Sequence, residues 1–191
     1  MKTSYIFLAP GFEETEALTV VDILRRAGME VVTVAVNDDV KVEGAHGVPV
    51  VADVLFSDVN ISDPEWLICP GGMPGATNLA DNSDLGTLLT DTFGRGGKIA
   101  AICAAPAVVL APLGILDGRD ATCYPGFEQL CPRAVMHDTP VVVSDNLITG
   151  NGPAAAMRFA LAIVRSSMGE SVAREIGQGL LYYPSAMNFY F

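Results

Sequence analysis

The chain has 191 residues, of which half are apolar and only 17% are charged, a composition typical of a globular protein with a large buried core. Its 22 acidic residues outnumber its 11 lysines and arginines and give a net charge of -11, which argues against nucleic acid or an anionic membrane as a partner. No run approaches the ~20 apolar residues of a membrane helix. The sequence therefore predicts a soluble, cytoplasmic protein with a single domain over residues 1–191.

The first half of the chain alternates β-branched apolar runs with a segment of helical period. The expected elements are a strand at 5–9, an amphipathic helix at 13–28 closed by a glycine, a strand at 30–36, a hairpin on one sheet edge at 41–51, and a buried strand at 65–72. A strand, a helix and a second strand in this order predict a βαβ opening.

The second half continues the alternation after a polar loop and an acidic helix. The expected elements are a strand at 98–102, a helix at 103–114, strands at 121–125 and within 141–150, and a strongly apolar helix at 153–169. Strands that are apolar throughout and alternate with helices predict a mostly parallel sheet covered on both faces. The expected fold is a three-layer α/β sandwich.

Three motifs follow predicted strands directly. They are PGFEETE at 10–16, PGGMPGA at 70–76 and ICAAP at 102–106. In open parallel sheets, ligands bind beyond the carboxyl ends of the strands, where the strand-to-helix turns expose side chains and helix N-termini together. The sequence therefore predicts that a carboxylate cluster, a glycine turn and a thiol converge at one edge of the sheet.

Cys103 lies in the stretch AICAA, which has the spacing of small residues around a nucleophile elbow. Ala101 and Ala105 leave room for a tight, strained turn that aims the sulfur at the first turn of the following helix. There the thiolate is favoured, so a pKa below ~8.5 is expected for Cys103. The alternative interpretation is an ordinary buried cysteine.

Gly71 and Gly72 follow Pro70 with backbone N–H groups that no side chain obstructs. Together with the N–H of Ala104 they suit an oxyanion hole. The alternative is a tight turn that needs positive φ, and the glycines become informative only beside Cys103.

Three carboxylates, Glu13, Glu14 and Glu16, fall in the first turns of the first predicted helix, where the helix dipole stabilises negative charge. That explanation suffices for two of them. A carboxylate that points over the sheet towards Cys103 would be desolvated, its pKa would rise, and its protonated form would donate a hydrogen bond to the thiolate.

The chain resembles the ThiJ/PfpI superfamily over nearly its whole length, in the stretches GFEETEALTVVDILRRAG, PGGMPGA, AAICAAP, ATCYPGFE and ITGNGPAAAMRFALAIV. Within it, these stretches are most similar to the branch of the Parkinson-disease-associated protein deglycase and its YajL-type bacterial relatives. The resemblance implies a flavodoxin-like fold of the glutamine amidotransferase-like kind, a homodimer, and a nucleophilic, oxidation-sensitive Cys103. By motif position it implies that Glu16 contacts the thiol and that Gly72 and Ala104 are the oxyanion donors.

The sequence departs from that pattern at Tyr124, where family members often carry a histidine, and at Asn151, which replaces the arginine of an RGP motif. A Cys-His pair is therefore not evident, and base catalysis would rest on Glu16 or on a group that the sequence does not place. In similar proteins the hairpin of His46, and Arg26, approach the active site across the dimer. Both are candidate substrate contacts, although a simple turn residue is the default interpretation of His46.

The remaining thiols, Cys69, Cys123 and Cys131, form no CxxC or metal-finger pattern with Cys103, so all four cysteines are expected to be reduced. Core packing is the default for Cys69 and Cys123, which lie near predicted strand ends. The sequence has no metal-ligand cluster and no phosphate-binding glycine loop, so neither a metal nor a cofactor is expected.

The resemblance implies a cofactor-independent enzyme whose substrates are reactive dicarbonyls or their adducts. Its reaction would be the conversion of methylglyoxal to lactate without glutathione, or the deglycation of proteins and nucleotides. An oxidative-stress sensor or redox-regulated chaperone that uses Cys103 is the alternative, and a PfpI-like peptidase is weaker because the expected histidine is missing. The aromatic tail at 182–191 is expected to pack against the body or a partner.

Overall fold

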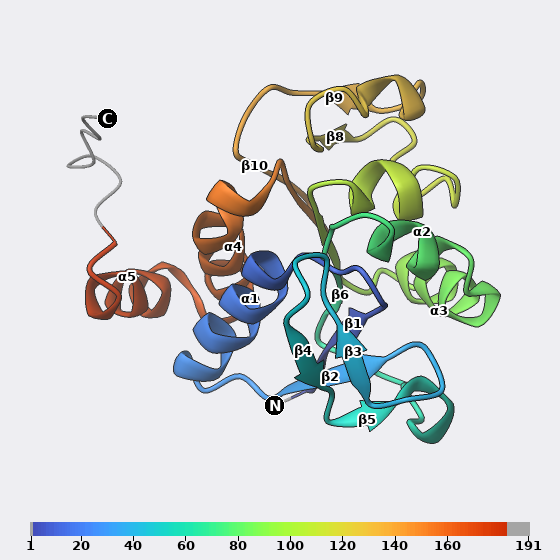
Figure 1. The fold of residues 1–191 in the computed structure, drawn as a ribbon. Helices are drawn as coiled ribbons and strands as arrows, with labels where there is room; N and C mark the ends of the chain where they lie inside the picture. The colour runs from blue at the N-terminus through green and yellow to red at the C-terminus, as the bar shows by residue number, and fades with distance from the viewer. Residues whose placement is uncertain (1, 183–191) are drawn as a thin grey trace.

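The computed structural model of the chain describes residues 2–182 and is built around a seven-stranded sheet (Figure 1). The strand order is β10-β11-β7-β6-β1-β2-β5, and all neighbours are parallel except β10 and β11. The strands are β1 (Ser4–Leu8), β2 (Val31–Ala35), β5 (Val54–Leu55), β6 (Leu67–Cys69), β7 (Ile99–Ile102), β10 (Val141–Ser144) and β11 (Leu147–Gly150). The prediction of a mostly parallel central sheet is confirmed.

Helices cover both faces of the sheet (Figure 1). On one face α1 (Glu14–Arg26) packs against α4 (Ala156–Met168), and α5 (Glu170–Gly179) packs on α4. On the other face lie α2 (Gly75–Ala80) and α3 (Ser83–Gly94). The molecule is therefore the three-layer α/β sandwich that the alternation of elements predicts.

Helix α1 buries one apolar face and positions its first turn beside the sheet. Ala17, Val20 and Leu24 recur at helical spacing and are buried against the core. The helix ends just before Gly28, whose φ of 76° lies in the left-handed region that favours glycine. The predicted end of this helix is thus confirmed, and its N-terminal glutamates lie at the carboxyl end of β1.

Trp66 packs in the core at the amino end of β6, away from the carboxyl ends of the strands. Its side chain is fully buried immediately before β6, and its Nε1 donates a hydrogen bond to Ser167 Oγ of α4 at 2.7 Å. The Lys98 ammonium lies 5.5 Å from the ring centroid and forms an ion pair with Glu65 at 2.7 Å. These contacts tie the start of the central strands to the end of α4.

Several elements differ from the expected ones. The hairpin of β3 (Lys41–Glu43) and β4 (Pro49–Val51) forms a sheet of its own instead of extending the central one, whose edge is β5. In the stretch expected as a strand at 121–125, only Ala121 is extended, as part of β8 (Asp120–Ala121), and β8 pairs with β9 (Val135–Met136) outside the central sheet. The hairpin and the β8–β9 pair therefore lie outside the central sheet.

The segment after β7 is also irregular. A turn at Cys103 and Ala104 leads into a π-helix at Pro106–Leu110, where an α-helix was expected over 103–114. The Ala111 N–H donates to the Pro106 carbonyl at 3.0 Å, which is the five-residue spacing of a π-turn. The polar stretch before β7 holds two helices, α2 and α3, where one was expected.

Within residues 2–182, no helix is long and apolar enough to cross a bilayer. The aromatic tail, which was expected to pack against the body or a partner, consists almost entirely of residues 183–191, and these lie outside the described part of the chain.

Candidate active site

Cys103 follows β7 directly and adopts a backbone conformation that L-residues rarely occupy, with φ of 63°. The turn is held on both sides, because the Cys103 N–H donates to the Gly150 carbonyl at 2.9 Å and its own carbonyl accepts from the Tyr124 N–H at 2.8 Å. Ala101 and Ala105 are fully buried. This is the strained elbow geometry that the small residues around Cys103 predict, and such a conformation costs of order 1–3 kcal/mol.

The sulfur of Cys103 is surrounded by the groups that the sequence analysis singled out. The backbone N–H groups of Gly72 and Ala104 donate to it, and the Glu16 carboxyl is hydrogen-bonded to it. Glu16 Oε2 in turn accepts from the Gly71 N–H at 2.8 Å. The structure therefore brings Cys103, Glu16, Gly71, Gly72 and Ala104 together at the carboxyl ends of β1, β6 and β7.

Glycine is required at both positions of the turn after β6. A Cβ on Gly71 would lie 2.8 Å from Glu16 Oε2 and 3.0 Å from the Cys103 sulfur. Gly72 has φ of 88°, and a Cβ there would collide with the backbone between Gly11 and Glu13. The close approach of this backbone to the thiol thus depends on the absence of side chains.

Of the three glutamates, Glu16 is the most deeply buried and the one hydrogen-bonded to Cys103, whereas Glu14 is buried against the hairpin. Glu16 is completely buried, and burial raises its pKa to about 7, against the opposing hydrogen bonds from the Gly71 N–H and the thiol. Within the described residues, its second oxygen, Oε1, has no hydrogen-bond partner. Near neutral pH, Glu16 therefore holds a proton on a substantial fraction of molecules.

The expectation of a lowered thiol pKa is wrong for Cys103 taken alone. Its side chain is only 8% exposed, and burial, followed by the negative charge of Glu16, raises the pKa of Cys103 to about 12. The N–H groups of Gly72 and Ala104 oppose this shift but do not overcome it. Burial and the neighbouring carboxylate outweigh the helix dipole, which alone would favour the thiolate.

The two groups nevertheless share their protons, since they are hydrogen-bonded to each other. After the pair loses its first proton near pH 7, the remaining proton lies on the sulfur or on the carboxyl oxygen. The second arrangement is a thiolate that accepts a hydrogen bond from a neutral Glu16. Because the pKa of Cys103 is about 12 and that of Glu16 about 7, the remaining proton lies mainly on the sulfur, and the thiolate beside neutral Glu16 is the minor form.

Glu14, by contrast, fastens the β3–β4 hairpin to α1. Its oxygens accept from the His46 N–H at 2.8 Å and the Val48 N–H at 3.3 Å, and its Oε2 lies 2.8 Å from His46 Nδ1. Although burial acts in the opposite direction, these hydrogen bonds lower the pKa of Glu14 to about 2. The sequence analysis assigned Glu14 only to the start of the helix and missed this tertiary contact.

One cluster in the described part of the chain has the side chains to hold a metal. Ligand atoms of Glu13, Glu14 and His46 lie within 4.8 Å of one another. Both oxygens of Glu14 already accept hydrogen bonds from the hairpin, so the observed contacts hold the hairpin against α1. That the protein uses no metal or cofactor stays a prediction.

Comparison with known proteins places these features in a family. Residues 2–166 match the DJ-1/PfpI family. The chain belongs to this family. It is 37% identical to protein dj-1beta of Drosophila melanogaster over 182 residues, which cover 94% of this chain and 97% of that protein. It is 36% identical to the glutathione-independent glyoxalase DJR-1.2 of Caenorhabditis elegans over 170 residues, 88% of this chain and 90% of that protein.

Other relatives are longer than this member of the DJ-1/PfpI family. It is 35% identical to DJ-1 homolog B of Arabidopsis thaliana over 185 residues, 96% of this chain but only 42% of that protein. Among solved structures, oxidised Toxoplasma gondii DJ-1 is similar with a TM-score of 0.92 and 38% identity, covering 95% of this chain and 99% of that one. The implied flavodoxin-like fold of the DJ-1/PfpI family is thus confirmed.

Arg26 and His46 do not join the thiol cluster of this DJ-1/PfpI chain. Arg26 is ion-paired with Asp22 at 2.7 Å near the end of α1, roughly 15 Å along the helix from Glu16. His46 is exposed on the hairpin, and its hydrogen bond to Glu14 raises its pKa. Substrate contacts from either residue across a dimer require a second copy and stay a prediction.

The backbone of Tyr124, and not its side chain, contacts the turn at Cys103. Its N–H donates to Cys103, whereas its half-exposed ring packs edge-on against Phe127 with centroids 6.2 Å apart. A phenol therefore stands where family members often carry a histidine. Glu16 remains the ionisable side chain that is hydrogen-bonded to the sulfur.

Proposed function

We propose that the protein is a cofactor-independent enzyme that acts on reactive dicarbonyls, converting methylglyoxal to lactate without glutathione. The observation that carries this proposal is the position of the Cys103 sulfur, between the N–H groups of Gly72 and Ala104 and the buried carboxyl of Glu16. The name of the C. elegans relative, a glutathione-independent glyoxalase, supports it.

In the first step, the sulfur attacks the aldehyde carbon of methylglyoxal and forms a hemithioacetal. Negative charge develops on the former carbonyl oxygen. The N–H groups of Gly72 and Ala104, which donate to the sulfur in the free protein, are the donors that would stabilise it. A proton, supplied by the Glu16 carboxyl in its neutral form, completes the hydroxyl group.

In the second step, Glu16 as a carboxylate removes the proton from the carbon bonded to sulfur and returns it to the neighbouring carbon. The enediol intermediate thereby becomes a thioester of lactate. Water then cleaves the thioester, so that methylglyoxal plus one water gives lactate and the free thiol. A group with a pKa of about 7 is suited to both directions of this transfer at neutral pH.

A deglycase reaction would begin with the same thiol attack, on the adduct that a dicarbonyl forms with an amine or thiol. A non-enzymatic role as an oxidative-stress sensor or redox-regulated chaperone is the second candidate. The oxidised state of the Toxoplasma gondii structure favours it. In that role Cys103 would become a sulfinic acid that accepts a hydrogen bond from Glu16.

The test is lactate formation from methylglyoxal without glutathione, in the wild type, Cys103→Ser and Glu16→Gln. We expect no activity in Cys103→Ser and a kcat lowered by about 10²-fold or more in Glu16→Gln, the range for general acid–base catalysis. Cys69→Ala is the matched control, because this thiol ends the neighbouring strand and is fully buried.

Full activity in Cys103→Ser would refute the mechanism. A wild type that makes no lactate, but whose Cys103 gains two oxygen atoms after mild peroxide treatment, would favour the sensor instead. Mass spectrometry of the Cys103 peptide distinguishes these results.

A further inference from the structure

Two thiols outside the proposed active site are in contact. Cys123 and Cys131 are eight residues apart, and their side chains are hydrogen-bonded to each other. The chain between them folds back through a 3-10 helix at Glu128–Leu130, where the Cys131 N–H donates to the Glu128 carbonyl at 2.9 Å. Local turns thus place the two sulfurs together, and neither residue takes part in the mechanism above.

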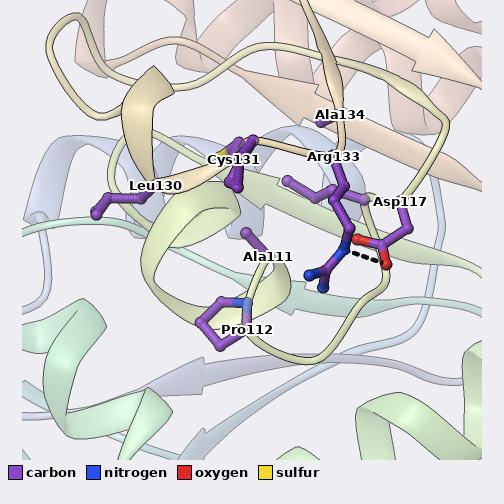
Figure 2. A pocket seen from close by; sticks show the side chains of 9 residues that line it. Ala111, Pro112, Asp117, Leu130, Cys131, Arg133 and Ala134 are labelled. Carbon is purple, nitrogen blue, oxygen red and sulfur yellow. Dashed lines mark hydrogen bonds and ion pairs between the residues drawn. The ribbon is translucent and has the colours of Figure 1, made fainter.

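Cys131 also lines a surface pocket of about 260 Å³ (Figure 2). Ala111, Pro112 and Leu130 contribute apolar walls, and the ion pair of Arg133 with Asp117, at 2.6 Å, lies beside the opening. Cys123 is not among the lining residues. Although the two residues are only 4% and 3% exposed, Cys131 is therefore the one of the pair that borders open space.

We propose that Cys123 and Cys131 are a redox-active dithiol, which peroxides oxidise to a reversible disulfide through initial attack by Cys131 from its pocket. The site is separate from the dicarbonyl chemistry at Cys103 and does not depend on it.

The hydrogen bond between the thiols decides which sulfur reacts first. Cys123 Sγ donates to the Tyr124 carbonyl at 3.5 Å, and the contact between the two thiols lowers the pKa of Cys131 and raises that of Cys123. Cys131 is thus the more acidic sulfur and also the one that lines the pocket. Since the thiolate is the nucleophile, both observations assign the first step to Cys131.

The reaction balances with one peroxide. The Cys131 thiolate attacks the peroxide oxygen, the O–O bond breaks, and Cys131 becomes a sulfenic acid while an alcohol or water leaves. The Cys123 sulfur then attacks the sulfenic sulfur, the S–S bond forms, and the hydroxyl group leaves with the thiol proton as water. Two molecules of a small thiol that enter the pocket reverse the oxidation by exchange.

Mass spectrometry tests the proposal directly, because both thiols lie on one tryptic peptide, residues 120–133, between Arg119 and Arg133. The intact protein is treated with increasing hydrogen peroxide, alkylated with N-ethylmaleimide in denaturant and digested without reduction. We expect this peptide to lose two hydrogen atoms and take up no alkyl group, in a dose-dependent way, and dithiothreitol to restore both alkylation sites.

Single variants separate the two roles. In Cys123→Ser, a sulfenic acid should accumulate on Cys131 and be trapped by dimedone, whereas in Cys131→Ser, Cys123 should stay reduced and alkylatable. Cys103→Ser and Cys69→Ala are controls in which the disulfide should form as in the wild type.

Three results would overturn the proposal. The first is a peptide that stays doubly alkylated at peroxide doses that oxidise Cys103. The second is a sulfenic acid that accumulates on Cys123 in Cys131→Ser. The third is loss of the disulfide in Cys103→Ser, which would mean that the oxidising equivalent comes from Cys103 and not from the pocket. None of these results bears on lactate formation, so the two proposals are tested separately.

Discussion

Gly71 is the residue on which the spacing of the reacting groups depends. A Cβ at this position would meet Glu16 Oε2 and the Cys103 sulfur at 2.8 and 3.0 Å, so an alanine must push the carboxyl and the thiol apart. We expect Gly71→Ala to lower kcat/KM for methylglyoxal by about 10²-fold, the loss seen when catalytic groups are displaced by about 1 Å. Steady-state lactate formation measures the effect.

Gly86→Ala is the matched control for this substitution. Gly86 lies within α3, and its added Cβ would make only an ordinary contact of 3.5 Å with Leu113. Activity should be unchanged and the free energy of unfolding should rise by roughly 0.5–1 kcal/mol, because alanine is the better helix former. Equal losses of activity in both variants would contradict the role given to Gly71.

Glu16 should also make stability depend on pH. Its folded-state pKa of about 7 lies above the ordinary glutamate value of 4.5, so the folded protein binds the extra proton between these values. The stability contributed by this proton is present below pH 4.5 and is lost as the pH rises through 7. Glu16→Gln does not titrate, so its stability relative to the wild type should rise by about 3 kcal/mol over this range.

Urea unfolding of both proteins at about pH 4 and about pH 8 gives this difference. A difference that is the same at both pH values would mean that folding does not raise the pKa of Glu16, so that the carboxyl is ionised at neutral pH. The proton shuttle assigned to Glu16 would then lose its physical basis.

At the scale of the elements, Glu14 holds the β3–β4 hairpin against α1 by its hydrogen bonds. Glu14→Gln replaces one accepting oxygen by an amide that faces N–H donors, at a cost of about 1–3 kcal/mol. Hydrogen exchange of the Gly44 and Ala45 amides should become about tenfold faster or more, because the hairpin opens more readily. NMR or mass spectrometry follows these amides.

Glu43→Gln is the control for the hairpin, since Glu43 lies exposed on β3 of the same hairpin. In Glu43→Gln, hydrogen exchange of the Gly44 and Ala45 amides should be as slow as in the wild type. If exchange is unaltered in Glu14→Gln as well, the backbone hydrogen bonds of Gly11 and Ala45, and not Glu14, hold the hairpin against the rest of the protein.

Periodicity predicts the elements that bury a regular face, and it predicts poorly those set by tertiary context. The strands and α1 and α4 were predictable because their apolar residues repeat at the spacing of their structure. Helix α5 was missed, although Val172, Ala173 and Ile176 carry a helical spacing, since Gly169 reads as the end of the preceding helix. The π-helix has no periodic signal of its own.

The candidate site was predictable to a different degree at each residue. The alanines around Cys103 indicate the elbow directly, because a tight turn excludes larger side chains. The choice of Glu16 among three glutamates came from the family resemblance, since only the packed structure shows which carboxyl meets the Cys103 thiol. The raised pKa of Cys103 and the anchoring contact of Glu14 depend on residues distant in sequence, so local patterns did not contain them.

At the scale of the molecule, we predict a homodimer that uses the surface around α1 and the β3–β4 hairpin. Large apolar side chains are exposed there, with Leu18 at 41%, Val48 at 48% and Val51 at 70%. Leu18 lies one turn beyond Glu14, the residue that contacts the hairpin, so these side chains come from two elements that are in contact. Burial of such side chains in a partner would remove them from water.

Sedimentation equilibrium should give 40.2 kDa, twice the chain mass of 20.1 kDa. Val51→Lys should shift the mass towards 20.1 kDa, because the interface would then bury an unpaired charge. Val143→Lys is the control, because Val143 is exposed on the edge strand β10. A wild type of 20.1 kDa would refute the dimer and the contacts of Arg26 and His46 that depend on it.

Trp66 is the single tryptophan of the chain, and it lies in a dry environment between the start of β6 and the end of α4. Its intrinsic fluorescence should therefore emit at short wavelength in the native state and shift to the red when the sheet and α4 separate. Since the indole lies at the start of β6 and the thiol follows the end of β7, ligands at Cys103 should leave the emission nearly unchanged. Tryptophan fluorescence should therefore report global unfolding of this protein independently of ligands bound at the carboxyl ends of the strands.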